Sequence, residues 1–465
     1  MAYIGKTPVL GNFVKLDAIS VVNGQAAYTM QNGSVNFTSY DNVNQFLVSL
    51  NGILQSPTDS FTVSGSTLTF ASNLSTGDVI DFVMVLGNTL DVGTPSDNTV
   101  TTAKLADDAV TNAKLSFNAN QYRNIIINGD MSIAQRATSQ SSVTTTGYYT
   151  CDRFQWIADY GTVTLSQDTT VPSGQGFAKS YKVDVTTAGT VSSGGYVLVR
   201  QKIEGQNLQY LKKGTSNAKS LTLSFWIQST KTGTYIAELY DADNNRQISK
   251  AYTVSSSNTW EKKTLTFDGD TSGAFGNDNG GSLFLNLYLS AGTDYTSGTL
   301  NTSWNSSTNA NRVVGQVNAQ DNTANNIYFT GVQLEAGTTA SDFEFLPVDV
   351  NLQRCQRYYF RRQGDGSDQR AVSNGFATTT NKYRGVVVFP ITMRSNPTLT
   401  ESALETLRPG QVNDAVSAGS IIDASVNAAM VELIADSGTP YTAGNGLSVR
   451  VTSSTSAFIA FDGEL

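Results

Sequence analysis

The sequence predicts an all-β, multidomain chain, in which β-sandwich domains are joined by a short repeat linker and one short helix is present. Three observations predict this class. The chain is rich in Gly, Ser, Thr and Asn, with 40 Gly against 9 Pro, and only 15% of its residues are charged. Segments such as residues 221–228 alternate apolar and polar side chains, which is typical of strands with one buried face. Long helical patterns are nearly absent, and a length of 465 residues favours about three domains.

Charge and residue content exclude several classes of function. The net charge is −8, which argues against nucleic-acid binding by the whole chain. The sequence has no histidine, so His-based triads, His general bases and His metal ligands are excluded. Cys151 and Cys355 either form a bridge or remain two buried or free thiols, and a reducing cytosol favours the second alternative.

The first residues have no charged segment followed by an apolar one, and no apolar run reaches membrane length. We therefore expect synthesis in a cytosol, no secretion through a signal peptide and no membrane insertion. Exposure to the outside would need another exit, such as cell lysis.

Residues 1–92 are expected to form a small β-sandwich. Strands are predicted at residues 27–30, 44–52, 60–64, 67–70 and 78–86. Glycine-containing turns lie between them, among them Asn32-Gly33 and Asn51-Gly52.

Residues 93–120 contain a tandem repeat and are expected to form a linker or stalk. The sequence Val-Thr-Thr-Ala-Lys-Leu at 100–105 returns as Val-Thr-Asn-Ala-Lys-Leu at 110–115. Ten residues at 3.6 per turn rotate the second copy off the starting face of a helix, whereas strand alternation or one small turn unit per copy is compatible. Two copies are too few to bury their apolar side chains alone, so the missing neighbours are expected to be other subunits.

Residues 121–348 are expected to form a second β domain, with strands within 180–185, 196–203, 221–228, 235–240, 260–267, 283–289 and 326–337. Residues 349–465 are expected to form a third, led by a short helix that Asp349 or Asn351 can cap. Leu352, Cys355 and Tyr359 share one face at helical spacing, which suggests packing against copies of this helix or against the adjoining sandwich. Strands are predicted there at 371–376, 384–390, 446–451 and 457–461.

The first and last parts resemble tail-fibre proteins. Residues 47–57, 61–70 and 77–81 resemble the N-terminal β domain of tail fibres in short-tailed phages, notably cyanophages, and the repeat is similar to the linkers of such fibres. In that family this domain lies near the virion. Residues 354–359, followed by 389–400, resemble the C-terminal domain of many phage tail proteins, whose distal end is commonly the receptor-binding tip.

The middle part resembles a carbohydrate-binding-module jelly roll. The resemblance lies in its opening, residues 124–133, and in its ending, residues 326–337. The family opens with Asn-Leu-x-x-Asn-Gly-x-Phe-Glu, and here Met131-Ser132 replaces Phe-Glu. The Glu that helps to hold a structural calcium in many such modules is therefore missing.

Aromatic side chains are the first candidates for ligand contact. A glycan site needs exposed aromatic planes beside amides and carboxylates, because sugar rings present C–H faces that stack on them. Alternation directs Leu221, Leu223, Phe225 and Ile227 inward and places Trp226 on the other face, which is either the outer sheet surface or a subunit contact. Core packing is the competing interpretation for every tryptophan, most clearly for Trp260 at a strand start. The remaining candidates are Trp304, which we expect to be exposed in a polar loop, and the preceding Tyr295.

Positive charge gathers between residues 354 and 394. It suits either an anionic ligand, such as an acidic glycan or lipopolysaccharide, or a salt-bridge layer with acidic residues of another unit or chain, and we favour the layer. The main candidates are Arg357, Arg361, Arg362 and Arg384, with Arg354, Arg370, Lys382 and Arg394 beside them.

Two acidic fragments, residues 268–273 and 241–245, resemble partial calcium loops. The first has Asn279 at the twelfth position, where a Glu is required, and the second has Arg246 where Gly belongs. We therefore expect acidic hairpin turns, no metal site and no cofactor. No carboxylate pair, nucleophile elbow, phosphate-binding glycine loop or long β-helix repeat stands out, so no catalytic residue is predicted.

The leading hypothesis is a homotrimeric virion tail fibre, assembled in a host cytoplasm. It would attach through residues 1–92 to tail adaptor or nozzle proteins and bind host-surface polysaccharide or lipopolysaccharide. A purely structural head or neck fibre, or a tail adaptor without glycan binding, is the alternative. A polysaccharide-trimming enzyme is a third possibility, against which the missing catalytic constellation argues.

Overall fold

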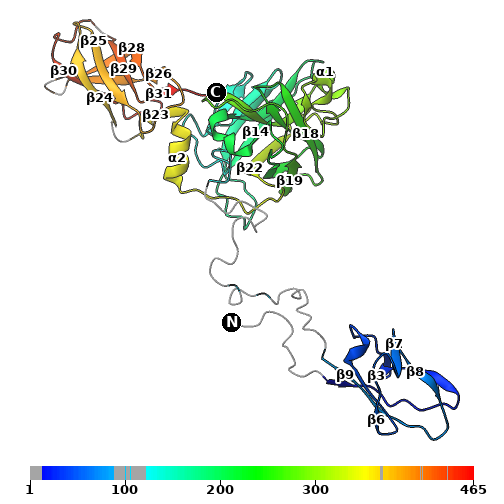
Figure 1. Ribbon diagram of the computed structural model, residues 1–465. Coiled ribbons are helices and arrows are strands. Elements are labelled where there is room, and N and C mark those ends of the chain that lie inside the picture. The colour runs from blue at the N-terminus through cyan, green and yellow to red at the C-terminus, as the bar shows by residue number, and fades with distance from the viewer. Residues whose placement is uncertain are drawn as a thin grey trace. The chain divides into compact units, whose positions relative to one another are not determined.

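The computed structural model describes residues 13–87, 122–366, 370–408, 412–436 and 438–465, together with residues 100, 105 and 410. The chain forms two compact units, Met1–Thr111 and Asn112–Leu465 (Figure 1). The predicted all-β class is confirmed, because strands make up most of the regular structure. Two α-helices occur in the described residues, α1 (Thr293–Thr296) and α2 (Val348–Gln356). Neither is long or apolar enough to span a membrane.

The first unit packs two antiparallel sheets around a small core. The sheet orders are β1-β9-β5-β6 and β2-β8-β7, with β3 and β4 paired beside them. Phe46, Phe61 and Leu68 lie in the core between the sheets. The Asn51-Gly52 turn has positive φ at both residues, as a tight hairpin turn between β5 and β6 requires. The elements are β1 (Phe13–Lys15), β2 (Gln25–Thr29), β3 (Gln31–Asn32), β4 (Val35–Asn36), η1 (Val43–Gln45), β5 (Phe46–Leu50), β6 (Ile53–Leu54), β7 (Phe61–Ser64), β8 (Thr67–Leu74) and β9 (Ile80–Leu86).

The repeat at residues 99–115 lies outside the described residues, apart from Val100 and Leu105. Both of these side chains are exposed.

The first part of the second unit is a sandwich of a six-stranded and a seven-stranded antiparallel sheet. The six-stranded sheet contains, in order, β10 (Ser139–Val143), β13 (Thr162–Asp168), β14 (Ser180–Thr187), β22 (Asn326–Ala336), β16 (Leu221–Ser229) and β19 (Glu261–Phe267). The seven-stranded sheet contains β11 (Gly147–Tyr148), β12 (Gln155–Ala158), β15 (Tyr196–Glu204), β20 (Gly281–Ala291), β17 (Gly233–Asp241), β18 (Arg246–Val254) and β21 (Asn305–Ser306).

The core of this sandwich follows strand alternation. On β16, the side chains of Leu221, Leu223, Phe225 and Ile227 are buried between the sheets, as predicted. The opposite face of β16 is also covered in part, because other segments of the chain pack over it. Trp226 lies on that face and is half-buried.

Helix α2 joins the sandwich to the C-terminal part. The predicted capping is wrong: Pro347 occupies the N-cap, and no side chain caps the helix. Asn351 is instead buried, and its amide donates to Asp130 and to Ser132 of the sandwich. Cys355 is buried against the sandwich in a small apolar cluster. The apolar stripe of α2 is therefore satisfied within the chain, and self-association is not needed to cover it.

The C-terminal part contains a closed six-stranded barrel and a three-stranded sheet (Figure 1). The barrel order is β24 (Arg370–Ala377), β25 (Lys382–Val388), β29 (Ala428–Ala435), β28 (Val412–Ala424), β27 (Leu404–Arg408) and β30 (Gly446–Val451). The sheet contains β23 (Tyr359–Gln363), β31 (Phe458–Asp462) and β26 (Thr398–Ser402). Tyr359 belongs to β23 and not to the helix, because the helix ends before it.

Candidate functional site

A cavity of about 340 Å³ lies against the outer face of the six-stranded sheet, and Trp226 forms part of its wall. We call it the Trp226 cavity. Four of its lining side chains are aromatic: Phe177, Trp226, Phe343 and Phe345. Trp226 reaches it from β16, Phe177 from the segment before β14, and the other two phenylalanines from the segment after β22.

The three phenylalanines hold one another in place. Their ring centroids are 4.8 to 5.1 Å apart, in tilted or edge-to-face arrangements. Phe177 lies over Gly331 of β22, where a Cβ would come within 2.5 Å of the phenylalanine ring. Gly331 also has a φ of +62°, in the left-handed region that favours glycine. This glycine therefore permits the close approach of Phe177 that shapes the cavity.

Polar groups of three kinds also line the Trp226 cavity. Gln175 offers an amide, Lys262 an ammonium and Asp342 a carboxylate, and all three residues are exposed. Lys262 of β19 lies directly opposite Trp226 in the strand register. The carboxylate of Asp342 has no hydrogen bond or ion pair within the described part of the chain, so it remains available to a ligand.

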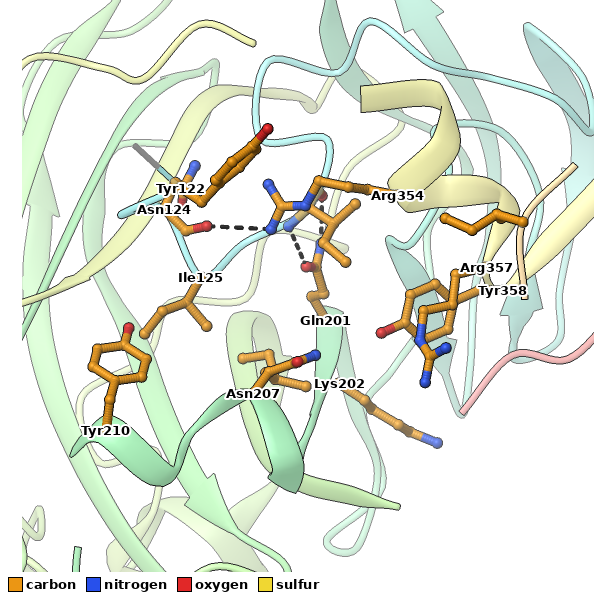
Figure 2. Close-up of a pocket in the computed structure, with 13 residues that line it drawn as sticks. Tyr122, Asn124, Ile125, Gln201, Lys202, Asn207, Tyr210, Arg354, Arg357 and Tyr358 are labelled. Atoms are coloured by element: carbon orange, nitrogen blue, oxygen red, sulfur yellow. Dashed lines mark hydrogen bonds between the residues drawn. The ribbon is translucent and has the colours of Figure 1, made fainter. Parts of the chain in front are cut away.

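A second cavity, of about 310 Å³, lies where the sandwich meets α2 (Figure 2). We call it the Arg354 cavity. Arg354, Arg357 and Tyr358 reach it from the end of α2 and the turn after it, while Asn124 and Lys202 reach it from the sandwich. It is thus shared between two parts of the fold.

The junction around this second cavity is strongly ionic. Glu204 is fully buried, and Arg357 donates two hydrogen bonds of 2.7 Å to it. Burial raises the pKa of Glu204, but the hydrogen bonds from Arg357 and Tyr358 outweigh burial, so the net shift is below the ordinary value. Nearby, Arg153 is buried, pairs with Glu464 and stacks over the Tyr358 ring.

The arginines predicted as one patch do not form one. Arg357 pairs with Glu204, and Arg361 donates to the backbone carbonyl of Arg136 and lies over the Phe458 ring at 4.1 Å. Arg362 donates to the carbonyls of Ala371 and Val372. Arg384 pairs with Glu432 inside the barrel part. The pair of Arg357 with Glu204 joins the end of α2 to another part of the same chain, whereas a salt-bridge layer with another chain stays a prediction.

Two of the three predicted glycan contacts lie elsewhere. Trp304 was expected to be exposed, and this is wrong: it is half-buried against the sandwich core, and its indole donates to the Asp268 carbonyl at 2.7 Å. Tyr295 of α1 is half-buried and packs edge-on against Tyr196 at 5.1 Å. Only Trp226 lines one of the two cavities described above. Trp260 is half-buried against Tyr328, beside an edge strand.

Both calcium-like fragments, residues 241–245 and 268–273, contact the ammonium of Lys213. The ammonium of Lys213 lies 2.5 Å from Asp241 and 3.0 Å from Asp270, and it donates to the carbonyls of Ser272 and Gly273. A buried ammonium therefore occupies the position in which these oxygens would otherwise hold a cation. In the described residues no group of three or more acidic or thiol side chains is arranged to hold a metal ion.

The cysteines are both buried and unbridged, as the favoured alternative predicted. Burial raises the pKa of both thiols well above the ordinary value, so neither is a thiolate at neutral pH.

Sequence reasoning missed most of the side chains that line the cavities. The available signal was the alternation Phe343-Glu344-Phe345 in a segment with no predicted strand. The Arg354 cavity had a weaker signal, because its parts come from four separate stretches of the sequence.

No protein-family model matches the chain, and no curated protein matches it in sequence. Among solved structures, it is similar to the enzymatically active domain of Bacteriophage CBA120 tailspike protein 4, with a TM-score of 0.26 and 15% identity over 46% of this chain and 22% of that one. It is also similar to a C-terminal family 22 carbohydrate-binding module of Clostridium thermocellum, with a TM-score of 0.25, 11% identity and coverage of 48% and 99%. A third similar structure is a carbohydrate-binding module solved with β-1,4-galactotriose. Its TM-score is 0.24, with 10% identity over 46% of this chain and 99% of that one. All three scores and identities are low, so nothing about the activity of this chain follows from them.

Proposed function

We propose that this chain is a non-catalytic phage tail-fibre protein that binds host-surface glycan through the Trp226 cavity. One observation carries the glycan part of the proposal. The half-buried indole of Trp226 and three phenylalanines line a cavity of about 340 Å³, which also offers an amide, an ammonium and a carboxylate.

This combination suits a sugar. The C–H faces of a pyranose ring pack on an indole, while hydroxyl groups need donors and acceptors at its edge. Gln175 and Lys262 are donors, and Asp342 is an acceptor. The volume is near the lower end of the range for small-molecule sites, so the cavity suits one or two sugar residues of a longer chain.

The virion part of the proposal rests on the sequence. Residues 47–57 resemble phage tail fibres near their attached end, and residues 354–359 resemble C-terminal domains of phage tail proteins. We assign attachment to tail adaptor or nozzle proteins to residues 1–92, the stalk to residues 93–120, glycan binding to residues 121–348 and the tip to residues 349–465. Three chains per fibre would multiply weak sugar contacts into avidity.

The proposal is tested on a glycan array with the full chain, Trp226→Ala and Trp260→Ala. Trp260 is the matched control, because it is also a half-buried tryptophan of the same sheet region but does not line the cavity. Wild type and Trp260→Ala should bind the same glycans, and Trp226→Ala should lose them. Absence of binding by all three proteins would favour a purely structural fibre or adaptor.

The trimer is tested separately by light scattering of the full chain. A mass of three chains is expected. A monomer at high concentration would refute the trimer and leave the glycan proposal to its own test.

A further inference from the structure

We propose that the Arg354 cavity is a second ligand site, which binds a sugar bearing a carboxylate. The inference goes beyond glycan binding by the Trp226 cavity and does not depend on it. It rests on an unneutralised guanidinium that faces a cavity with exposed aromatic rings at its mouth (Figure 2).

Within the part of the chain that the structure describes, Arg354 has almost no partner. Its one hydrogen bond is a long one, 3.4 Å from Nη2 to the carbonyl of Asn124. No carboxylate oxygen lies within 4 Å of its nitrogens in the described residues. A guanidinium carries five N–H donors, so most of them are free. Burial lowers the pKa of Arg354, which means that its neighbours only partly offset the desolvation cost of the charged form.

The acidic side chain that influences Arg354 already accepts hydrogen bonds from other groups. Glu344 acts on Arg354 electrostatically. Its two oxygens, however, accept the backbone N–H groups of Tyr122 and Asn124, at 2.6 and 2.9 Å. None of the residues that line the cavity is an aspartate or a glutamate. The cavity is therefore positive, with nothing of opposite charge inside it.

The other two cations of the cavity already have hydrogen-bond partners, and one of them is in an ion pair. Arg357 is bound by Glu204, and Lys202 donates to the Leu465 carbonyl at 2.8 Å. Arg354 thus offers a planar fork that has no acidic partner among the described residues. Such a fork matches a planar carboxylate through two parallel hydrogen bonds.

The rest of the cavity suits the body of a sugar. Tyr122 and Tyr210 are both exposed, so their rings can stack on the C–H face of a pyranose. Asn207, in the short 3-10 helix η4 (Gly205–Asn207), is exposed and makes no side-chain hydrogen bond within the described residues. Its amide is free to bind hydroxyl groups. These groups together define a ligand with one carboxylate and a ring with several hydroxyls, such as a hexuronic acid.

The test is calorimetric titration of the full chain with three probes: trigalacturonate, its fully methyl-esterified form and glucose 6-phosphate. The ester keeps the sugar rings and removes the charge, and the third probe replaces the carboxylate with a phosphate. Wild type should bind trigalacturonate at least tenfold more tightly than either alternative. Arg354→Gln should weaken trigalacturonate binding about tenfold to a hundredfold, the usual effect of losing hydrogen bonds to a charged group.

Two further variants keep the result interpretable. Arg354→Lys keeps the charge and loses the fork, so its affinity should lie between those of wild type and Arg354→Gln. Arg384→Gln is the control, because this arginine pairs with Glu432 away from the cavity. Thermal unfolding of Arg354→Gln should occur at or above the wild-type temperature, since a half-buried charge without an acidic partner in the described residues is removed.

Unchanged trigalacturonate binding in Arg354→Gln, or equal binding of the ester, would overturn the proposal. Tighter binding of glucose 6-phosphate would overturn the assignment to a carboxylate. A marked loss of stability in Arg354→Gln would show that the arginine is structural. Trp226→Ala should bind trigalacturonate like wild type, so failure of the Trp226 proposal and failure of this one give different results.

Discussion

The two cavities of the second unit are similar in size and opposite in construction. The Trp226 cavity is lined by residues of the sandwich and of the segment that follows it, and its wall is aromatic. The Arg354 cavity is built between the sandwich and α2, and its charged groups are all cations. The first draws its shape from packed rings, and the second from a buried ionic junction.

The two cavities therefore depend on the rest of the fold in different ways. Two of the four aromatic side chains of the Trp226 cavity, Phe343 and Phe345, come from the segment after β22 and lie outside the sandwich core. The Arg354 cavity lies beside the ion pair of Glu204 and Arg357, which is one of the contacts between the sandwich and the end of α2. Substitution of Phe345 should therefore separate stability from binding at the first cavity, whereas substitution of Glu204 should lower both at the second.

The largest effect is expected from Glu204→Ala. This change leaves Arg357 and the Tyr358 hydroxyl without their buried acceptor. Breaking a buried pair on one side costs about 3–5 kcal/mol of unfolding free energy. Denaturant unfolding would measure it, and a loss below about 1 kcal/mol would show that the ionic junction does not hold the second cavity together.

The stability of the junction between the sandwich and the C-terminal part should depend on pH. Asp152 accepts the backbone N–H of Gln135, whose side-chain amide in turn donates to the Tyr359 carbonyl. Burial raises the pKa of Asp152 from 3.8 to about 6. Because the folded state holds this proton more tightly than the unfolded state, stability should fall as the pH rises from about 4 to about 6.

The loss attributable to Asp152 is at most about 3 kcal/mol, from about two units of pKa. Unfolding free energies of wild type and Asp152→Asn across this range would measure it. The variant should lack this part of the slope. Parallel curves for the two proteins would rule out the shift.

At the Trp226 cavity, Gly331→Ala should have a moderate effect. The residue has φ +62°, which costs a non-glycine residue about 1–2 kcal/mol, and the new methyl group would displace the Phe177 ring. Glycan affinity should fall with stability in this variant. If affinity is unchanged, the position of Phe177 does not matter for binding.

The smallest effect on stability is expected from Phe345→Ala. Its side chain is 49% exposed, so its removal should cost less than about 1 kcal/mol. Affinity for the glycan found on the array should nevertheless fall several-fold, because part of the cavity wall is lost. Titration and thermal unfolding of the same sample would measure both quantities. A large loss of stability with unchanged affinity would show that Phe345 supports the fold and not binding. This would contradict the difference drawn between the two cavities.

The sequence predicted the strands of this chain better than its sites. Alternation along β16 correctly directed Phe225 inward and Trp226 outward, because strand geometry is local. The same logic failed at Trp304, since a polar loop can still be folded back against a core. It also missed the closed barrel, whose closure depends on pairing between β24 and β30, strands about 70 residues apart.

The charged residues show the same limit. A run of arginines near α2 predicted an ion-pair layer, but the sequence did not reveal that Glu204 of β15 is the partner of Arg357. Nor could it show that Arg354, one turn earlier, has no acidic partner among the residues that the structure describes. Both facts depend on which surface of the sandwich α2 covers, and that is decided by apolar contacts such as the packing of Cys355.

The most direct measurement is a crystal structure of the full chain with a glycan selected on the array. The account predicts a sugar ring stacked on the indole of Trp226, with hydroxyl groups bound by Gln175, Lys262 or Asp342. Electron density for the glycan at another place on the chain, with the Trp226 cavity empty, would contradict it.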